Sequence, residues 1–172
     1  MQTNLYANQF ADFFASADLQ DKMKNSVVLI KSVRRIFFIG NGGSNSICSH
    51  MMEDYGKIGG FRTFSFSDPA LITCYANDCG YENAVAEWLK LHLDAGDLLI
   101  AISSSGESKN IINAVTVAHQ KETKVITLSG FAEQNTLSKM GTINIHLPIK
   151  NYGIVECFHQ TILHIILDSL NG

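Results

Sequence analysis

The chain has 172 residues, of which 46% are hydrophobic and 17% charged, as expected for one globular domain spanning residues 1–172. Thirteen Lys and Arg against sixteen Asp and Glu give a formal charge of −3, which argues against a nucleic-acid partner held by a broad basic face. No apolar run reaches the ~18 residues that a membrane span needs, and no basic start precedes an apolar block as in a signal peptide. We therefore expect a cytoplasmic protein with reduced cysteines and no membrane partner.

Short apolar runs alternate along the chain with longer stretches of helical spacing. Residues 1–33 are expected to form an N-terminal helical segment, and residues 34–172 an α/β core. Strands are predicted over residues 35–40, 61–67, 97–102, 124–128 and 143–149. Helices are predicted over residues 46–57, 81–93, 109–119, 133–139 and 152–170. Strands that alternate with helices favour parallel pairing through right-handed crossovers, and so a three-layer αβα sandwich.

A glycine-rich loop follows the first predicted strand, at the edge where parallel sheets bind ligands. Gly40, Gly42 and Gly43 permit positive φ angles and close approach of a ligand to the backbone. Asn41 and Ser44 add hydrogen-bonding side chains, and the next helix would point its N-terminus at the site. The loop matches neither GxGxxG nor the P-loop, and a tight turn with a helix cap is an equally good interpretation.

A second loop, residues 103–108 (SSSGES), follows the third predicted strand and holds four serines. Their hydroxyls and the backbone N–H groups at a helix start would form a neutral cradle that suits a phosphate monoester. A polar turn with one N-cap serine is the plainer interpretation, but four serines in six residues exceed what a cap requires. The carboxylate of Glu107 would have to point away from a bound phosphate.

Two pairs of metal-type ligands lie on predicted helices. His50 and Asp54 are four residues apart and so share one helix face. Glu156 and His164, on the last helix, are two turns or about 12 Å apart and would meet one ligand only by reaching toward each other. They could also serve different copies of the site in an oligomer. Packed core histidines are the competing interpretation, and His159 receives no role.

The segments GNGGSNSICSHMMED, ISSSGES, KVITLSG and IVECFHQTILHII, with the pair Asn77-Asp78, resemble the sugar isomerase (SIS) domain family. The resemblance extends from about Ile36 to Leu170, and it is closest to the heptose phosphate isomerases of that family. It implies a flavodoxin-like sandwich around a five-stranded parallel sheet. It also implies a homotetramer with active sites between subunits.

The resemblance assigns roles to residues that match the family's motifs. Substrate contacts would come from the two loops and from the Asn-Asp pair: Asn41, Gly42, Gly43, Ser44, Asn77, Asp78, Ser103, Ser104, Ser105 and Ser108. One Zn²⁺ ion would be held by His50, Asp54, Glu156 and His164. The catalytic groups would be Asp54 as base, His164 as acid, and Glu156 sharing the role of base.

Three positions depart from the family pattern. Asp54 stands where the family has a catalytic Glu, and the shorter side chain displaces the carboxylate by about an ångström or more, a shift that can cost on the order of 100-fold in rate. Glu156 replaces a metal-binding Gln, which adds a negative charge and favours a divalent cation. The stretch over residues 151–154 (NYGI) lacks the family's Asp-Arg pair. The chain is therefore consistent with a sister group that acts on a related sugar phosphate.

The resemblance predicts aldose–ketose isomerisation through an enediol, with sedoheptulose 7-phosphate converted to D-glycero-D-manno-heptose 7-phosphate. In bacteria this reaction would supply heptose for lipopolysaccharide or for a capsular glycan. Two alternatives stay open at this point. One is isomerisation of a related sugar phosphate, and the other is a non-catalytic tetrameric module that serves as a protein adaptor or a sugar-phosphate sensor.

Overall fold

A five-stranded parallel sheet forms the centre of the computed structural model, which describes residues 3–170. The strands are β1 (Arg35–Ile39), β2 (Arg62–Ser65), β3 (Leu98–Ser103), β4 (Lys124–Gly130) and β5 (Ile143–Leu147). Their spatial order is β2-β1-β3-β4-β5, so the chain turns back on itself between β1 and β3. The order, the parallel pairing and the five strands confirm the predicted fold class.

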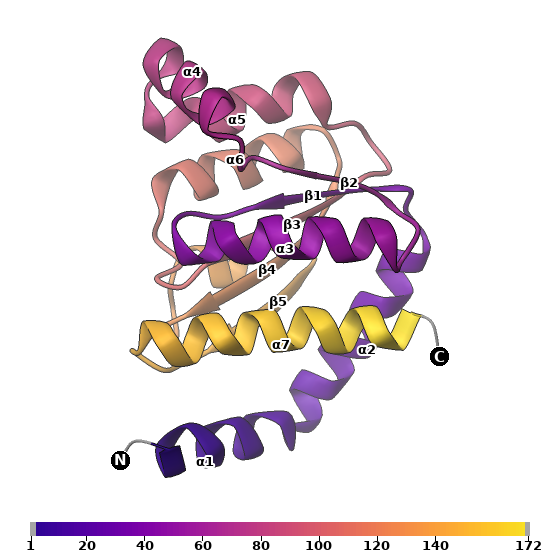
Figure 1. The fold of residues 1–172 in the computed structure, drawn as a ribbon, viewed down its shortest axis with the longest axis vertical. Coiled ribbons are helices and arrows are strands. Elements are labelled where there is room, and N and C mark those ends of the chain that lie inside the picture. Colours follow the sequence, from indigo (N-terminus) through magenta and orange to yellow (C-terminus); the bar gives the residue numbers. More distant parts are fainter. Residues whose placement is uncertain (1–2, 171–172) are drawn as a thin grey trace.

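Helices cover both faces of the sheet (Figure 1). One face carries α2 (Ala17–Lys31), α3 (Gly43–Lys57) and α7 (Tyr152–Leu170). The other face carries α5 (Tyr81–His92) and α6 (Lys109–Gln120), with α4 (Pro69–Cys79) packed on α5. The first helix, α1 (Thr3–Phe14), extends away from the sheet (Figure 1). The predicted three-layer sandwich is therefore confirmed.

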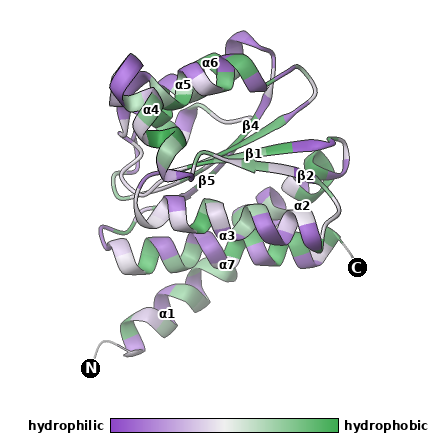
Figure 2. Ribbon diagram, turned by 45° about the horizontal axis from the view of Figure 1, so that its top comes forward, coloured by the Kyte–Doolittle hydropathy of each residue, from purple (hydrophilic) through white to green (hydrophobic). Residues whose placement is uncertain are grey.

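The central strands β1 and β3 fold between two helical layers because their side chains are apolar on both faces. In β1, Ile36 and Phe38 pack beneath α3 and α7, whereas Phe37 and Ile39 pack beneath α5 and α6. Figure 2 shows largely hydrophobic strands between helices in which hydrophobic and hydrophilic residues alternate along the ribbon. Burial on both faces makes the positions of β1 and β3 insensitive to changes at the surface.

Several predicted boundaries differ from the structure. The N-terminal segment is two helices, because Ser16 begins α2 and its Oγ accepts a hydrogen bond from the N–H of Leu19 (3.5 Å). Helix α4 was not predicted, although Leu71, Ile72, Tyr75 and Ala76 recur at helical spacing and pack partly buried against the core beneath α5. Helix α3 begins at Gly43 rather than at residue 46, and the predicted helix over 133–139 is only a short 3-10 turn, η1 (Leu137–Lys139).

None of the helices within residues 3–170 combines the length and apolar character that crossing a membrane requires.

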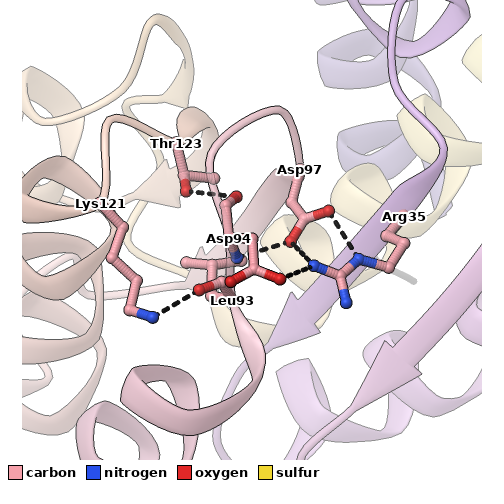
Figure 3. A network of polar contacts seen from close by, with 6 residues as sticks. All are labelled: Arg35, Leu93, Asp94, Asp97, Lys121 and Thr123. Carbon is pink, nitrogen blue, oxygen red and sulfur yellow. Dashed lines mark hydrogen bonds and ion pairs between the residues drawn. The ribbon is translucent and has the colours of Figure 1, made fainter.

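An ion-pair network fixes the start of β1 against the turn that precedes β3 (Figure 3). The guanidinium of Arg35 donates from Nε to Asp97 Oδ1 (2.8 Å) and from Nη2 to Asp97 Oδ2 (2.7 Å). It also bonds the exposed Asp94, whose own backbone N–H donates to Asp97 (2.7 Å). These bonds raise the pKa of Arg35, with the Asp97 bond the largest cause. Asp97 is 5% exposed, so its carboxylate needs these donors.

We expect Asp97→Asn to lower the free energy of unfolding by about 1–3 kcal/mol, because a nearly buried charge-assisted pair becomes neutral on one side. Asp94→Asn is the matched control, since that side chain is 70% exposed and should contribute below about 1 kcal/mol. Urea unfolding at neutral pH measures both. Equal losses in the two variants would contradict this assignment.

His159 is fully buried in the core beside β4, where its Nε2 contacts the carbonyl oxygen of Ser129 (3.2 Å). Burial disfavours the charged imidazolium and lowers the pKa of His159 to about 4. Burial also lowers the pKa of the nearby His146, whose Nδ1 contacts Ser129 Oγ (2.9 Å). His159 therefore belongs to the core as a neutral side chain.

The depressed pKa makes stability depend on pH. The unfolded chain takes up a proton on His159 near its ordinary pKa of about 6.5, whereas the folded chain does so only near 4. Protonation of His159 therefore leaves the free energy of unfolding unaffected above about pH 6.5. As the pH falls from 7.5 to 5, it lowers the free energy of unfolding by about 2 kcal/mol. His159→Gln should reduce the loss between these two pH values by that amount in urea unfolding. An unchanged pH dependence would refute the claim.

Candidate active site

Two ligand-binding loops meet at the carboxyl edge of the sheet. β1 pairs directly with β3, so the glycine loop after Ile39 lies beside the serine loop after Ser103. Strand order reverses at this pair, which is where open α/β sheets form a crevice. Helices α3 and α6 begin at the two loops and direct their N-termini to the same edge. The topology therefore concentrates positive helix-end potential at one place.

The glycine loop is held from below by an amide pair. Asn41 Nδ2 donates to Asn110 Oδ1 (2.9 Å), and Asn110 Nδ2 donates back to Asn41 Oδ1 (2.8 Å). The hydroxyl of Tyr81 also donates to Asn41 Oδ1 (2.9 Å). Gly42 has φ 53° and ψ −121°, a conformation that favours glycine. Most of the hydrogen-bonding capacity of Asn41 is thus used to fix the loop.

The serine loop turns sharply and leaves one hydroxyl free. Gly106 has φ 68°, and a Cβ there would collide with the side chain of Asn135, which packs beneath the turn. Ser103 Oγ accepts from the N–H of Gly106 (3.2 Å) and contacts Ser108 Oγ (3.1 Å). Ser104 Oγ is buried, and it has no hydrogen-bond partner among residues 3–170. A buried hydroxyl without a partner marks the place where a polar ligand group would bind.

A cavity of about 150 Å³ joins the two loops. It is lined by Asn41, Ser44, Ser103, Ser104, Ser105, Ser108, Tyr152 and Glu156. Glu107 faces away, as expected, because its carboxylate accepts hydrogen bonds from the N–H (2.7 Å) and Oγ1 (2.8 Å) of Thr136. The lining that the structure describes contains no Lys or Arg. It offers an anion neutral donors and helix N-termini, and Glu156 adds one carboxylate beside them.

A cluster of possible metal ligands lies between α3 and α7. His50 Nε2 lies 3.2 Å from Asp54 Oδ2, and His164 Nδ1 lies 3.8 Å from the same oxygen. One ligand atom from each residue falls within 4.8 Å of the others. Ligands bound to Zn²⁺ at 2.0–2.2 Å in tetrahedral geometry are about 3.3 Å apart, so these residues fit one divalent ion with small adjustments.

The cluster is held in place by a buried bond between its two helices. The hydroxyl of Tyr55, which follows Asp54, donates to the carbonyl oxygen of Leu163, which precedes His164 (2.9 Å). Burial raises the pKa of Tyr55, so this hydroxyl stays protonated as a donor. The bond fixes the relative position of α3 and α7, and therefore the distance from Asp54 to His164.

Glu156 lies apart from this cluster. Its carboxylate packs against Gly43 at the start of α3, where any Cβ would collide with it. It faces the cavity of the serine loop, two helical turns before His164. Within this chain, therefore, the two histidines and Asp54 form one group, and Glu156 joins the ligand-binding loops.

Asn77 and Asp78 lie on the outer helix α4 and are exposed. Asn77 Nδ2 donates to Asp78 Oδ1 (2.9 Å), and neither residue lines the serine-loop cavity.

Three residues that shape the site were not predicted from the sequence: Asn110, Tyr81 and Tyr152. Asn110 is 69 positions from Asn41, and no sequence pattern links the two. Tyr152 lies in the segment where the expected Asp-Arg pair is missing. That departure from the family pattern was the one feature of the sequence that pointed to this segment.

Comparison with known proteins agrees with this architecture. A family model described as SIS domain matches residues 13–130. The phosphoheptose isomerase of Hamiltonella defensa is 32% identical, over 94% of this chain and 83% of its own length. That of Fusobacterium nucleatum is 34% identical, over 80% of this chain and 73% of its own.

Solved structures share the fold. The phosphoheptose isomerase of Neisseria gonorrhoeae superposes with a TM-score of 0.88 at 22% identity, covering 98% of this chain and 95% of that one. That of Francisella tularensis superposes with a TM-score of 0.85 at 24% identity, covering 98% and 94%. Together with the family model and the curated relatives, these matches lead to one conclusion: the chain belongs to the SIS domain family and, within it, to the phosphoheptose isomerases.

Proposed function

We propose that this chain isomerises sedoheptulose 7-phosphate to D-glycero-D-manno-heptose 7-phosphate. The observation that carries the proposal is that an anion-binding site and an acid–base cluster lie along the same helix, α3. An anion cradle with the unpartnered Ser104 hydroxyl lies at the start of α3, and an acid–base cluster lies farther along the same helix. The relatives named phosphoheptose isomerase support the same reaction.

The cradle would bind the phosphate. Ser104 Oγ supplies a free hydroxyl, and the N-termini of α3 and α6 supply N–H groups and partial positive charge. Ser44 in the cavity lining and His50 in the cluster are six positions apart on α3, about 9 Å along the helix axis. Such a span suits an extended sugar phosphate better than a triose phosphate.

Asp54 would remove the proton next to the sugar carbonyl. Its carboxylate is 19% exposed, so water is largely displaced while one oxygen faces both histidines. His164, whose Nδ1 lies 3.8 Å from this oxygen, would return a proton to the neighbouring position of the enediol. The buried hydroxyl bond of Tyr55 keeps the base and the acid at this separation.

His50, Asp54 and His164 would hold one Zn²⁺ ion, which supplies Lewis-acid polarisation of the sugar oxygens when bound. The donor set of two imidazoles and one carboxylate suits zinc and leaves room for a further ligand. Glu156 would be the fourth ligand and the second base. Its carboxylate lies at the serine-loop cavity rather than in the cluster, so it would reach the ion only by extending toward it or from a neighbouring copy of the chain.

We further propose a homotetramer with sites between subunits. Asn77 and Asp78 are exposed on α4, outside the cavity of their own chain, so they would reach a sugar only in a neighbouring copy. This arrangement would reconcile their proposed contact with substrate and their position. A cytoplasmic location and the single domain over residues 1–172 stay predictions.

Asp54→Asn should reduce kcat by at least about 100-fold, because the amide cannot accept the proton that the reaction must move. The variant keeps nearly the same shape, so its thermal unfolding should be unchanged. Turnover of sedoheptulose 7-phosphate with zinc supplied measures the effect. Asp54→Glu is the control that retains a carboxylate, and near-normal turnover by Asp54→Asn would reject Asp54 as the base.

Ser104→Ala should raise KM for the phosphorylated sugar by about 5- to 20-fold with a smaller change in kcat, because one hydrogen bond to the charged phosphate is lost. Ser138→Ala offers a matched control, since Ser138 Oγ is bonded to the carbonyl oxygen of Asn135 away from the cavity (2.7 Å). Steady-state kinetics distinguishes the two. A KM equal to that of the unaltered protein would count against the cradle.

A further inference from the structure

An aromatic pair borders the cavity of the serine loop. The rings of Phe131 and Tyr152 meet edge to face, with centroids 4.8 Å apart and planes inclined by 76°. Tyr152 lines the cavity together with Glu156 and the serines, and it is 61% exposed. The ring is therefore both at the cavity and accessible, so a ligand bound in the cavity could contact it.

The chain holds this pair in a fixed position. Phe131 has φ 64°, a left-handed conformation that costs a bulky residue energy. Its N–H donates to the carbonyl oxygen of Ile149 (3.3 Å), which connects the end of β4 to the segment before α7. Asn151 Oδ1 then accepts from the N–H of Ile154 (3.1 Å), which fixes the start of α7 at Tyr152. These bonds fix the backbone from which both rings project.

The rest of the lining lacks an apolar surface for a sugar. It consists of serine hydroxyls, the amide of Asn41 and the carboxylate of Glu156, and Tyr152 is the one aromatic residue that the structure describes there. A sugar presents hydroxyls at its edges and carbon-bound hydrogens on its faces. Polar groups bind the former, whereas an aromatic ring packs against the latter.

We propose that Tyr152, backed by Phe131, packs against the carbon-bound face of the phosphorylated sugar and fixes its orientation above the phosphate cradle. This inference rests on the proposed isomerisation and makes Tyr152 a specificity-determining residue. In this proposal the aromatic ring of Tyr152, which packs against Phe131, contacts the sugar. The serines of the loop bind the phosphate. Tyr152 occupies the segment in which the expected Asp-Arg pair is missing.

The test compares two probes that share the phosphate group. Sedoheptulose 7-phosphate and inorganic phosphate are titrated separately into the full chain and followed by ³¹P NMR. Tyr152→Ala should raise the Kd of the sugar phosphate by about 5- to 10-fold and leave that of inorganic phosphate unchanged. Tyr152→Phe keeps the ring and should stay within about 2-fold for both probes. Leu91→Ala, which removes an exposed apolar side chain on α5, is the control and should alter neither.

Three results would overturn the inference while the wild-type chain still binds and converts the sugar phosphate. Tyr152→Ala leaves its Kd unchanged, or it weakens both probes equally, or Tyr152→Phe loses as much as Tyr152→Ala. An unchanged Kd would show that Tyr152 does not contact the sugar. Equal weakening of both probes would show that Tyr152 acts on the phosphate, and an equal loss in Tyr152→Phe would show that the hydroxyl makes the contact. If the wild-type chain bound neither probe, the proposed function itself would fail, and the inference with it.

Discussion

The parallel pairing of β1 with β3 is the constraint on which the site depends. It places the glycine loop and the serine loop side by side, although some 60 residues separate them in the chain. The helices that follow then start at the same edge, and α3 continues from the cavity to His50 and Asp54. Because β1 and β3 are buried on both faces, this placement is supported by the whole core.

The two regions of α3 differ in the charge of the ligand that they favour. Its N-terminus faces a cavity with no Lys or Arg in the lining, where helix ends and hydroxyls balance the charge of an anion. Farther along, two imidazoles surround the carboxylate of Asp54 in a ligand set suited to a divalent ion. Glu156 lies at the first region, where its carboxylate packs against Gly43 and brings a negative charge to the cavity.

The sequence predicts most of the sheet and part of the site, for identifiable reasons. Strands such as β1 and β3 are apolar on both faces, and the spacing of His50 and Asp54 places them on one helix face. Helix α4 is not predicted, although Leu71, Ile72, Tyr75 and Ala76 recur at helical spacing, because this apolar stripe is short and only partly buried. The Asn41–Asn110 pair depends on tertiary contact, and the direction in which Glu156 points depends on its side-chain rotamer. Neither leaves a periodic signal.

The central claim is that this chain, with Asp at position 54, performs enediol chemistry on a phosphorylated heptose. Proton NMR of sedoheptulose 7-phosphate in D₂O, with the folded protein and added zinc, tests it most directly. The account predicts deuterium incorporation next to the carbonyl together with the signals of the aldose product. Absence of both deuterium exchange and aldose, with the same protein folded and zinc supplied, would contradict it.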